Sequence, residues 1–96
     1  MKRIEGDIWT RNKEKFIKHN GNIKTYYRYL VEQYIGFKLP AGYTIHHLNE
    51  NHEDNRLENL CVIPTKLHVW IHRTGKTKDL FESNLDKIKN NPGLIR

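Results

Sequence analysis

Five of the six histidines in this 96-residue chain fall between positions 46 and 72. They are His46, His47, His52, His68 and His72. An even distribution along the chain would place far fewer histidines in that span. Imidazole is both a metal ligand and a proton acceptor near neutral pH, so this concentration indicates a reactive site.

His68 and His72 are spaced to bind one metal ion. Residues four apart on a helix lie one turn from each other on the same face, so both imidazoles can reach one cation without a change in the backbone. Such a pair taken alone is more often a surface pair, and a third ligand has to come from elsewhere. His46 or His47 supplies it, which leaves the other member of that pair free to take a proton from water. The free ring needs an acceptor for its second nitrogen, and the side-chain oxygen of Asn59 is the candidate.

Two short strands and a helix are predicted to carry these residues. Residues 43–47 are rich in β-branched and aromatic side chains, and residues 60–63 form a second apolar run. A polar loop over residues 49–58 joins them. The spacing of apolar side chains then predicts a helix over residues 65–73, with the two later histidines bordering its apolar stripe.

A regular strand turns His46 and His47 toward opposite faces of the sheet. Both side chains can serve one phosphate only if the strand bends or ends at this point. The polar residues 49–51, directly after the strand, favour such an end.

The flanking segments are predicted to form an N-terminal hairpin, a helix and a C-terminal helix. Asn20-Gly21 readily adopts the positive φ angles of a two-residue hairpin turn. Apolar residues at helical spacing predict a helix over about residues 26–35, and Gly36 ends it. A final amphipathic helix is expected from the spacing of Phe81, Leu85 and Ile88.

The chain is predicted to be a single α+β domain over residues 1–96. A basic N-terminal hairpin and helix occupies residues 1–42, the core with the histidines residues 43–73, and the C-terminal helix and tail residues 76–96. The aliphatic runs are far shorter than a membrane span requires, and no signal peptide is expected. Cys61, the only cysteine, excludes an internal disulfide and suits a reducing compartment, so a cytoplasmic location is expected.

The net charge of +6 favours a polyanionic partner. Most of the surplus lies in one run, where Glu14 is the single acid among Arg11, Lys13, Lys15, Lys18, Lys24 and Arg28. A solvated face is the alternative interpretation of this run.

Three other conspicuous residues are predicted to lie outside the reactive site. Asn55 is expected to hydrogen-bond the loop backbone, and His52 to be solvated or close to DNA. Trp70 is most simply a core residue.

Three stretches in residues 43–73 follow a known order and spacing. They are His46-His47-Leu48-Asn49-Glu50-Asn51, then Asn55-Arg56-Leu57-Glu58-Asn59-Leu60, then the His68-x-x-x-His72 pair. This pattern resembles the HNH endonuclease motif of the ββα-metal nucleases, or His-Me finger nucleases, found in phage, intron and colicin-type enzymes. The resemblance implies a small ββα-metal core between the N-terminal and C-terminal elements.

The resemblance implies a role for each matching residue. His46 would bind the metal at a position where many members have Asp, and His47 would be the general base. Asn59 would orient His47, and His68 would be the second metal ligand. His72 matches the extra ligand of members that use three histidines. In members with two protein ligands it would instead be a surface residue or a phosphate contact.

The resemblance further implies a metal-dependent DNA endonuclease that leaves 5′-phosphate and 3′-hydroxyl ends. One divalent ion is expected, Zn, Mn, Ni or Mg, and all-nitrogen ligation suits Zn, Ni, Co or Mn better than Mg, which prefers oxygen. Phosphate contacts give affinity without sequence information. Weakly specific nicking or cleavage is therefore expected, and a phage or mobile-element origin in a bacterial host fits. The expected DNA-binding residues are Lys24, Arg28, Lys66 and Arg73.

Partners other than DNA remain open at this point. A homodimer through the stripe of Phe81, Leu85 and Ile88 would convert nicks into double-strand breaks, but core packing explains the stripe equally well. A phage or host protein that supplies specificity is another arrangement. The alternative functions are a catalytically inactive, metal-stabilised DNA-binding module of the same fold, and a small structural zinc protein.

Overall fold

The N-terminal residues form a three-stranded antiparallel sheet in the computed structural model, which describes residues 3–74 and 82–95. Its strands, in order across the sheet, are β1 (Ile8–Arg11), β2 (Glu14–His19) and β3 (Asn22–Thr25). The predicted hairpin is confirmed as β2 and β3. Their turn is Asn20-Gly21, with φ angles of 52° and 77° as a two-residue hairpin turn requires.

Strand β1 adds to the predicted hairpin. It pairs with β2 across a second two-residue turn, Asn12-Lys13, whose φ angles are 52° and 65°. This turn lacks glycine, and Lys13 bears a side chain that disfavours positive φ, so the sequence carries only a weak turn signal. Cross-strand stacking of Trp9 on Phe16, with ring centroids 6.1 Å apart, supports the pairing.

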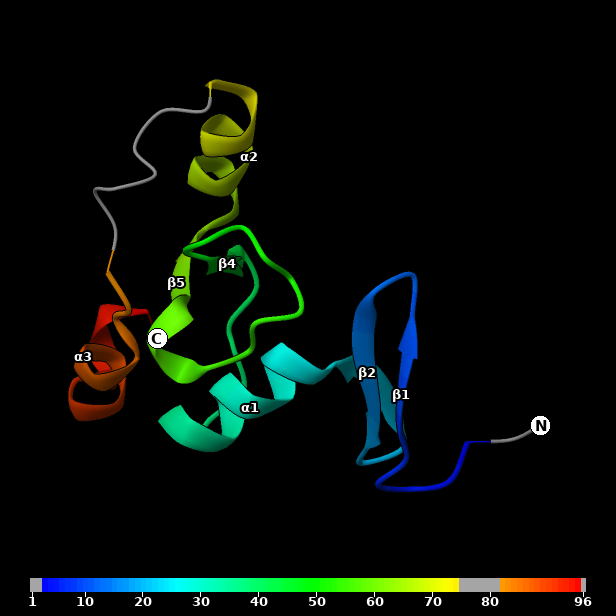
Figure 1. Cartoon of the computed structure of the whole chain (residues 1–96). Coiled ribbons are helices and arrows are strands. Elements are labelled where there is room, and N and C mark those ends of the chain that lie inside the picture. The colour runs from blue at the N-terminus through cyan, green and yellow to red at the C-terminus, as the bar shows by residue number, and fades with distance from the viewer. Residues whose placement is uncertain (1–2, 75–81, 96) are drawn as a thin grey trace.

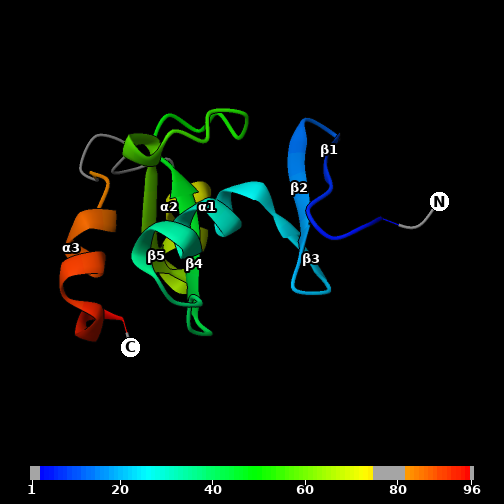
Figure 2. The same ribbon diagram turned by 90° about the horizontal axis from the view of Figure 1, so that it is seen from below.

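Helix α1 (Tyr26–Ile35) follows β3 directly and confirms the predicted range. Gly36 ends the helix in the left-handed conformation, with φ of 90°, and its N–H donates to the carbonyl of Glu32. The helix contacts both β2 and β3. It therefore connects the N-terminal sheet to the rest of the molecule (Figure 2).

Strands β4 (Tyr43–His47) and β5 (Leu60–Pro64) form an antiparallel pair, and helix α2 (Thr65–Thr74) follows β5 directly (Figure 1). All three confirm the predicted elements, with α2 and β5 each one residue longer than expected. The loop between the strands ends in a short 3₁₀ helix, Leu57–Asn59. This strand–strand–helix unit confirms the predicted α+β fold with a ββα core.

Helix α3 (Leu85–Asn90), followed by a 3₁₀ turn at Pro92–Leu94, packs beside β5. Leu85 and Ile88 are almost fully buried within the chain. Core packing of the C-terminal stripe is thereby confirmed for these two residues, which are not exposed for the homodimer contact considered above. Phe81, the third member of that stripe, lies outside the described residues.

The two faces of the β4–β5 sheet pack against different helices. Ile45 and Leu60 belong to the larger core cluster, on the side of α1 and α3. Cys61 and Ile71 belong to a smaller cluster, on the side of α2. Figure 1 shows α1 and α2 on opposite sides of the strands. Because neighbouring strand residues alternate between faces, adjacent side chains of β4 enter different layers.

None of the helices within residues 3–74 and 82–95 is both long enough and apolar enough to cross a membrane.

Candidate functional site

His46 lies on the α2 face of β4 and is 2% exposed. Its ring centroid is 5.3 Å from that of His68 and 5.7 Å from that of His72. The His46 Nε2 atom is buried and has no hydrogen-bond partner among the described residues. A buried polar atom without a partner costs free energy, so an orphaned nitrogen on a ring that lies beside two other imidazoles is typical of a metal ligand.

His68 and His72 complete a cluster whose chemistry fits a divalent metal. One turn of α2 places their Nε2 atoms 2.8 Å apart, and one nitrogen from each of the three histidines lies within 4.8 Å of the others. Two nitrogens bound to one tetrahedral zinc ion at about 2.0–2.1 Å lie roughly 3.4 Å apart, so the most widely separated pair needs to close by roughly 1.4 Å at most. His46 is buried, His68 half-buried and His72 exposed, so the cluster opens toward solvent.

The surroundings keep two of these imidazoles neutral near pH 7. Burial lowers the pKa of His46, and a positive charge on His72 would lower it further. Burial, with the same repulsion from His72 and His46, lowers the pKa of His68 to about 4. Neutral imidazole is the form that binds a metal, so both rings are ready to ligate without losing a proton.

These pKa shifts predict that the metal-free protein loses stability as the pH falls from about 6.5 toward 4. In that window the unfolded chain, with histidines of ordinary pKa, binds more protons than the folded one, so protonation favours unfolding. Thermal melts in EDTA between pH 7.5 and 4.5 measure the slope. His68→Gln lacks the titrating ring and is expected to show a shallower decline. Identical slopes for both proteins would contradict the lowered pKa of His68.

His47 lies on the other face of β4 and is also buried. Its ring meets the Tyr27 ring edge-on, with centroids 4.7 Å apart, and stacks nearly parallel to the His52 ring at 4.8 Å. The strand ends at His47, as the sequence predicted, but the two neighbouring rings still contact different elements. The cluster of His46, His68 and His72 and the ring of His47 therefore lie on opposite sides of the strand end.

Asn55 holds the His47 ring in one tautomer. Its Oδ1 lies 2.9 Å from Nε2 of His47. A carbonyl oxygen only accepts, so Nε2 carries the hydrogen and the Nδ1 lone pair stays available to take a proton. Burial lowers the pKa of His47, and the Asn55 contact opposes that effect in part.

The prediction that Asn59 contacts His47 directly is wrong. The Asn59 Oδ1 accepts from the backbone N–H of Asn49, and its Nδ2 donates to Asn49 Oδ1 and to the carbonyl of Asp54, each at 2.9–3.0 Å. Asn59 ends the 3₁₀ helix that precedes β5, and its side chain bonds to the loop that follows β4 and precedes β5. Asn59 thus closes the loop between the strands, and the loop carries Asn55 to His47.

Asn55 and His52 are the site residues that sequence reasoning assigned to other roles. Asn55 was predicted to bond loop backbone and His52 to be solvated. His52 is exposed, but its ring covers that of His47. Both residues belong to an irregular loop, where no periodicity tells which way a side chain points. The sequence offered one indication of a role for Asn55: the motif contains two Asn residues, Asn55 and Asn59.

Lys24 and Arg28 lie near each other beside the carboxylate of Glu32. Lys24 Nζ is 3.0 Å from Glu32 Oε1, and Arg28 Nη1 is 4.0 Å from Oε2. Both line a cavity that Tyr27 also borders. The structure thus brings these two predicted DNA contacts together, one side chain away from His47.

Lys66 and Arg73 lie on the face of α2 that points away from the three-histidine cluster. At about 100° per residue they lie on the far side of the helix from His68 and His72. They border a hollow that also includes Val69, Trp70 and Thr74. Trp70 is 45% exposed, so its predicted place in the core is wrong. Ile71, the next residue, fills the core position of this helix instead.

Part of the chain matches a known protein family. Residues 28–70 match a family model described as HNH endonuclease. The match runs from α1 into α2 and includes His46, His47, Asn59 and His68, while His72 lies two residues beyond it. Neither the curated proteins nor the solved structures contain a significant match.

Proposed function

The chain belongs to the HNH endonuclease family through residues 28–70, and we propose that it is a metal-dependent DNA endonuclease that hydrolyses phosphodiester bonds. The orphaned Nε2 of buried His46, on a ring that lies beside His68 and His72, carries the metal part of this proposal. The separately held His47 ring supports the nuclease part, because a metal-stabilised module that only binds DNA needs no general base.

His46, His68 and His72 are the proposed ligands of one divalent ion. Such an ion, when bound, neutralises charge on the scissile phosphate and stabilises the leaving 3′ oxygen. Three nitrogen donors favour Zn, Ni, Co or Mn over Mg. His72 lies outside the family match, and its support is the short distance to His68.

His47 is the proposed general base. Its Nδ1 takes one proton from the attacking water, and the ring becomes an imidazolium. As the hydroxide oxygen bonds to phosphorus, the bond between phosphorus and the 3′ oxygen breaks, and the 3′ oxygen leaves and takes a proton from solvent. Asn55 Oδ1 accepts the Nε2 hydrogen throughout, so the ring keeps its orientation while its charge changes. The contacts with Tyr27 and His52 restrict the ring further.

Lys24, Arg28, Lys66 and Arg73 remain the proposed contacts to DNA phosphates. Lys24 and Arg28 belong to β3 and the start of α1, whereas Lys66 and Arg73 belong to the outer face of α2. Backbone contacts of this kind hold DNA with little regard to sequence, so weak specificity is proposed.

Supercoiled plasmid tests the proposal. The metal-stripped protein is incubated alone and with separate additions of Mg, Mn, Ni and Zn, and the nicked form is measured over time. Nicking is expected only with added metal, and Mn or Ni is expected to exceed Mg. Plasmid that stays intact under every condition, while the protein binds DNA, would support the inactive DNA-binding module instead.

Asn55→Ala is expected to lower the nicking rate by roughly 10- to 100-fold without changing metal binding, because the His47 ring loses its fixed tautomer. Asn55→Asp retains an acceptor and adds a negative charge, which raises the pKa of His47. A general base works in its neutral form, so the acid limb of the pH–rate profile is expected to move to higher pH.

Asn59→Ala provides the contrast. It removes three loop hydrogen bonds and is expected to cost about 1–3 kcal/mol of stability. The acid limb of its pH–rate profile is expected to stay where it is in the unaltered protein. A shifted limb in Asn59→Ala, or an unshifted one in Asn55→Asp, would reverse the roles assigned to the two residues.

A further inference from the structure

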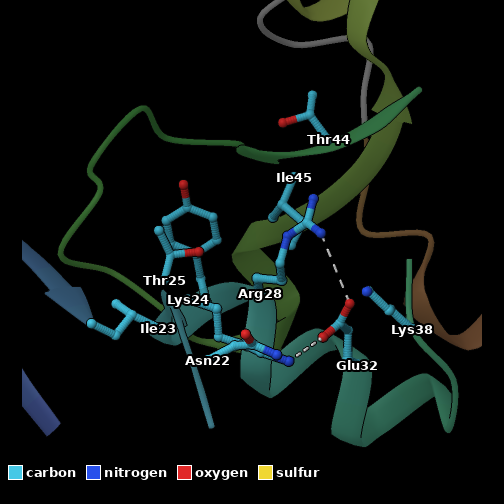
Figure 3. Close-up of a pocket in the computed structure, with 10 residues that line it drawn as sticks. Asn22, Ile23, Lys24, Thr25, Arg28, Glu32, Lys38, Thr44 and Ile45 are labelled. Carbon is cyan, nitrogen blue, oxygen red and sulfur yellow. Dashed lines mark hydrogen bonds and ion pairs between the residues drawn. The ribbon is translucent and has the colours of Figure 1, made fainter. Parts of the chain in front are cut away.

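A cavity of about 530 Å³ opens where β3, the start of α1 and β4 meet. Three cationic side chains from three separate segments line it: Lys24 of β3, Arg28 of α1 and Lys38 of the segment before β4. Figure 3 shows all three gathered around Glu32. The packing of β3, α1 and β4 against one another therefore brings these three side chains to one cavity.

Glu32 contacts two of these cations, Lys24 and Arg28. Its side chain is 7% exposed and accepts from Lys24 Nζ at 3.0 Å and from the backbone N–H of Leu39 at 2.9 Å. Arg28 Nη1 lies 4.0 Å from Oε2 of Glu32, and Lys24 contacts Oε1. A lysine ammonium has three donors and a guanidinium five, so most donors of both side chains remain available to a ligand.

The cavity carries surplus positive charge. Glu32 is the one acid among its lining residues, against three cations. The carboxylate lies buried while Arg28 is more exposed, so an incoming ligand meets the cations first. Thr25 and Thr44 add hydroxyl donors to the wall. Clustered cations with neighbouring hydroxyls are the chemistry that binds phosphate.

Tyr27 connects this cavity to the proposed general base. It lines the cavity, and its ring contacts the His47 ring at 4.7 Å. A phosphate in the cavity therefore lies about one side chain away from the group that would activate water. A nucleic acid strand carries a phosphate at every nucleotide, so a strand with one phosphate at His47 can present another here.

We propose that the cavity lined by Lys24, Arg28 and Lys38 binds a backbone phosphate of DNA other than the scissile one. The inference rests on the proposed endonuclease function for the identity of the polymer. By holding that phosphate, the cavity sets how the strand lies relative to His47. Lys38, which no motif in the sequence singles out, becomes a DNA-binding residue.

Binding of a labelled DNA duplex to the metal-free full-length chain tests the proposal, with Lys38→Ala compared against Lys87→Ala. Lys87 is an exposed cation of α3 and controls for the loss of one charge. Lys38→Ala is expected to weaken binding by roughly three- to tenfold and to reduce the slope of log affinity against log salt by about one. Lys38→Arg is expected to retain both, and Lys87→Ala to change neither. Equal effects of Lys38→Ala and Lys87→Ala would overturn the proposal.

Two further measurements use the unaltered protein or the nicking assay. DNA is expected to shift the NMR resonances of Arg28 and Lys38; unchanged resonances would overturn the proposal even if Lys38→Ala failed to fold. Inorganic phosphate that shifts them at micromolar concentration would show a small-anion site rather than a backbone contact. In the nicking assay, Lys38→Ala is expected to raise KM. Because the binding assay contains no metal, failure of cleavage and failure of this cavity are separately visible.

Discussion

His47→Ala is expected to lower plasmid nicking by about 10²- to 10⁴-fold, because general-base catalysis contributes an effect of that size. The ring contacts Asn55, Tyr27 and His52, and its Nδ1 is the proposed proton acceptor. Metal binding is expected to persist, since His47 lies on the other face of the strand from the His46, His68 and His72 cluster. The measurement pairs nicking rates with the metal-dependent rise in melting temperature.

His19→Ala is the matched control for that experiment. His19 belongs to β2 and contacts Tyr29, so its loss removes an imidazole outside the proposed site. The control is expected to nick at the rate of the unaltered protein. Nicking by His47→Ala at the same rate would remove His47 from the reaction, and a loss of metal binding would show that the two faces of β4 are not independent.

His46→Ala is expected to abolish the stabilisation that a divalent metal gives. In the unaltered protein, a metal at 100 times its Kd adds about 2.7 kcal/mol to the free energy of unfolding. For a domain of this size that is a rise of roughly 10–20 °C in melting temperature. Removal of the buried ligand leaves only His68 and His72 on α2, a pair at the protein surface.

The same melts rank the other two ligands. His68→Ala is expected to lose the rise as fully as His46→Ala does, and a partial loss in His72→Ala would still identify His72 as a third ligand. His52→Ala keeps all three nitrogens and is the control. An undiminished rise in His46→Ala would place the metal elsewhere and would leave its orphaned Nε2 without an explanation.

The two predictions separate the nuclease from the inactive DNA-binding module. Both proteins would lose metal stabilisation in His46→Ala. Only the nuclease has a use for an unligated, oriented imidazole beside the metal, so only its activity depends on His47. The pair of variants therefore tests structure and chemistry separately.

The local elements and the members of the three-histidine cluster could be predicted from the sequence alone. Helical spacing and Gly36 gave the bounds of α1, and the β-branched runs gave β4 and β5. His68 and His72 had to share a helix face because a helix repeats about every four residues. Strand alternation likewise required His46 and His47 to face apart. These features depend on neighbours a few residues away, which is the range over which backbone geometry controls side-chain direction.

Only the tertiary structure decided which side chains from separate segments of the chain contact one another. The loop from Leu48 to Asn59 is closed by Asn59, and the closure turns Asn55, rather than Asn59, onto His47. Packing of Ile71 into the core left Trp70 exposed and put Lys66 and Arg73 on the outer face of α2. The cavity around Glu32 joins residues of three segments. In each case the deciding contacts form between residues that have no fixed relation along the chain, so no local pattern in the sequence could specify them.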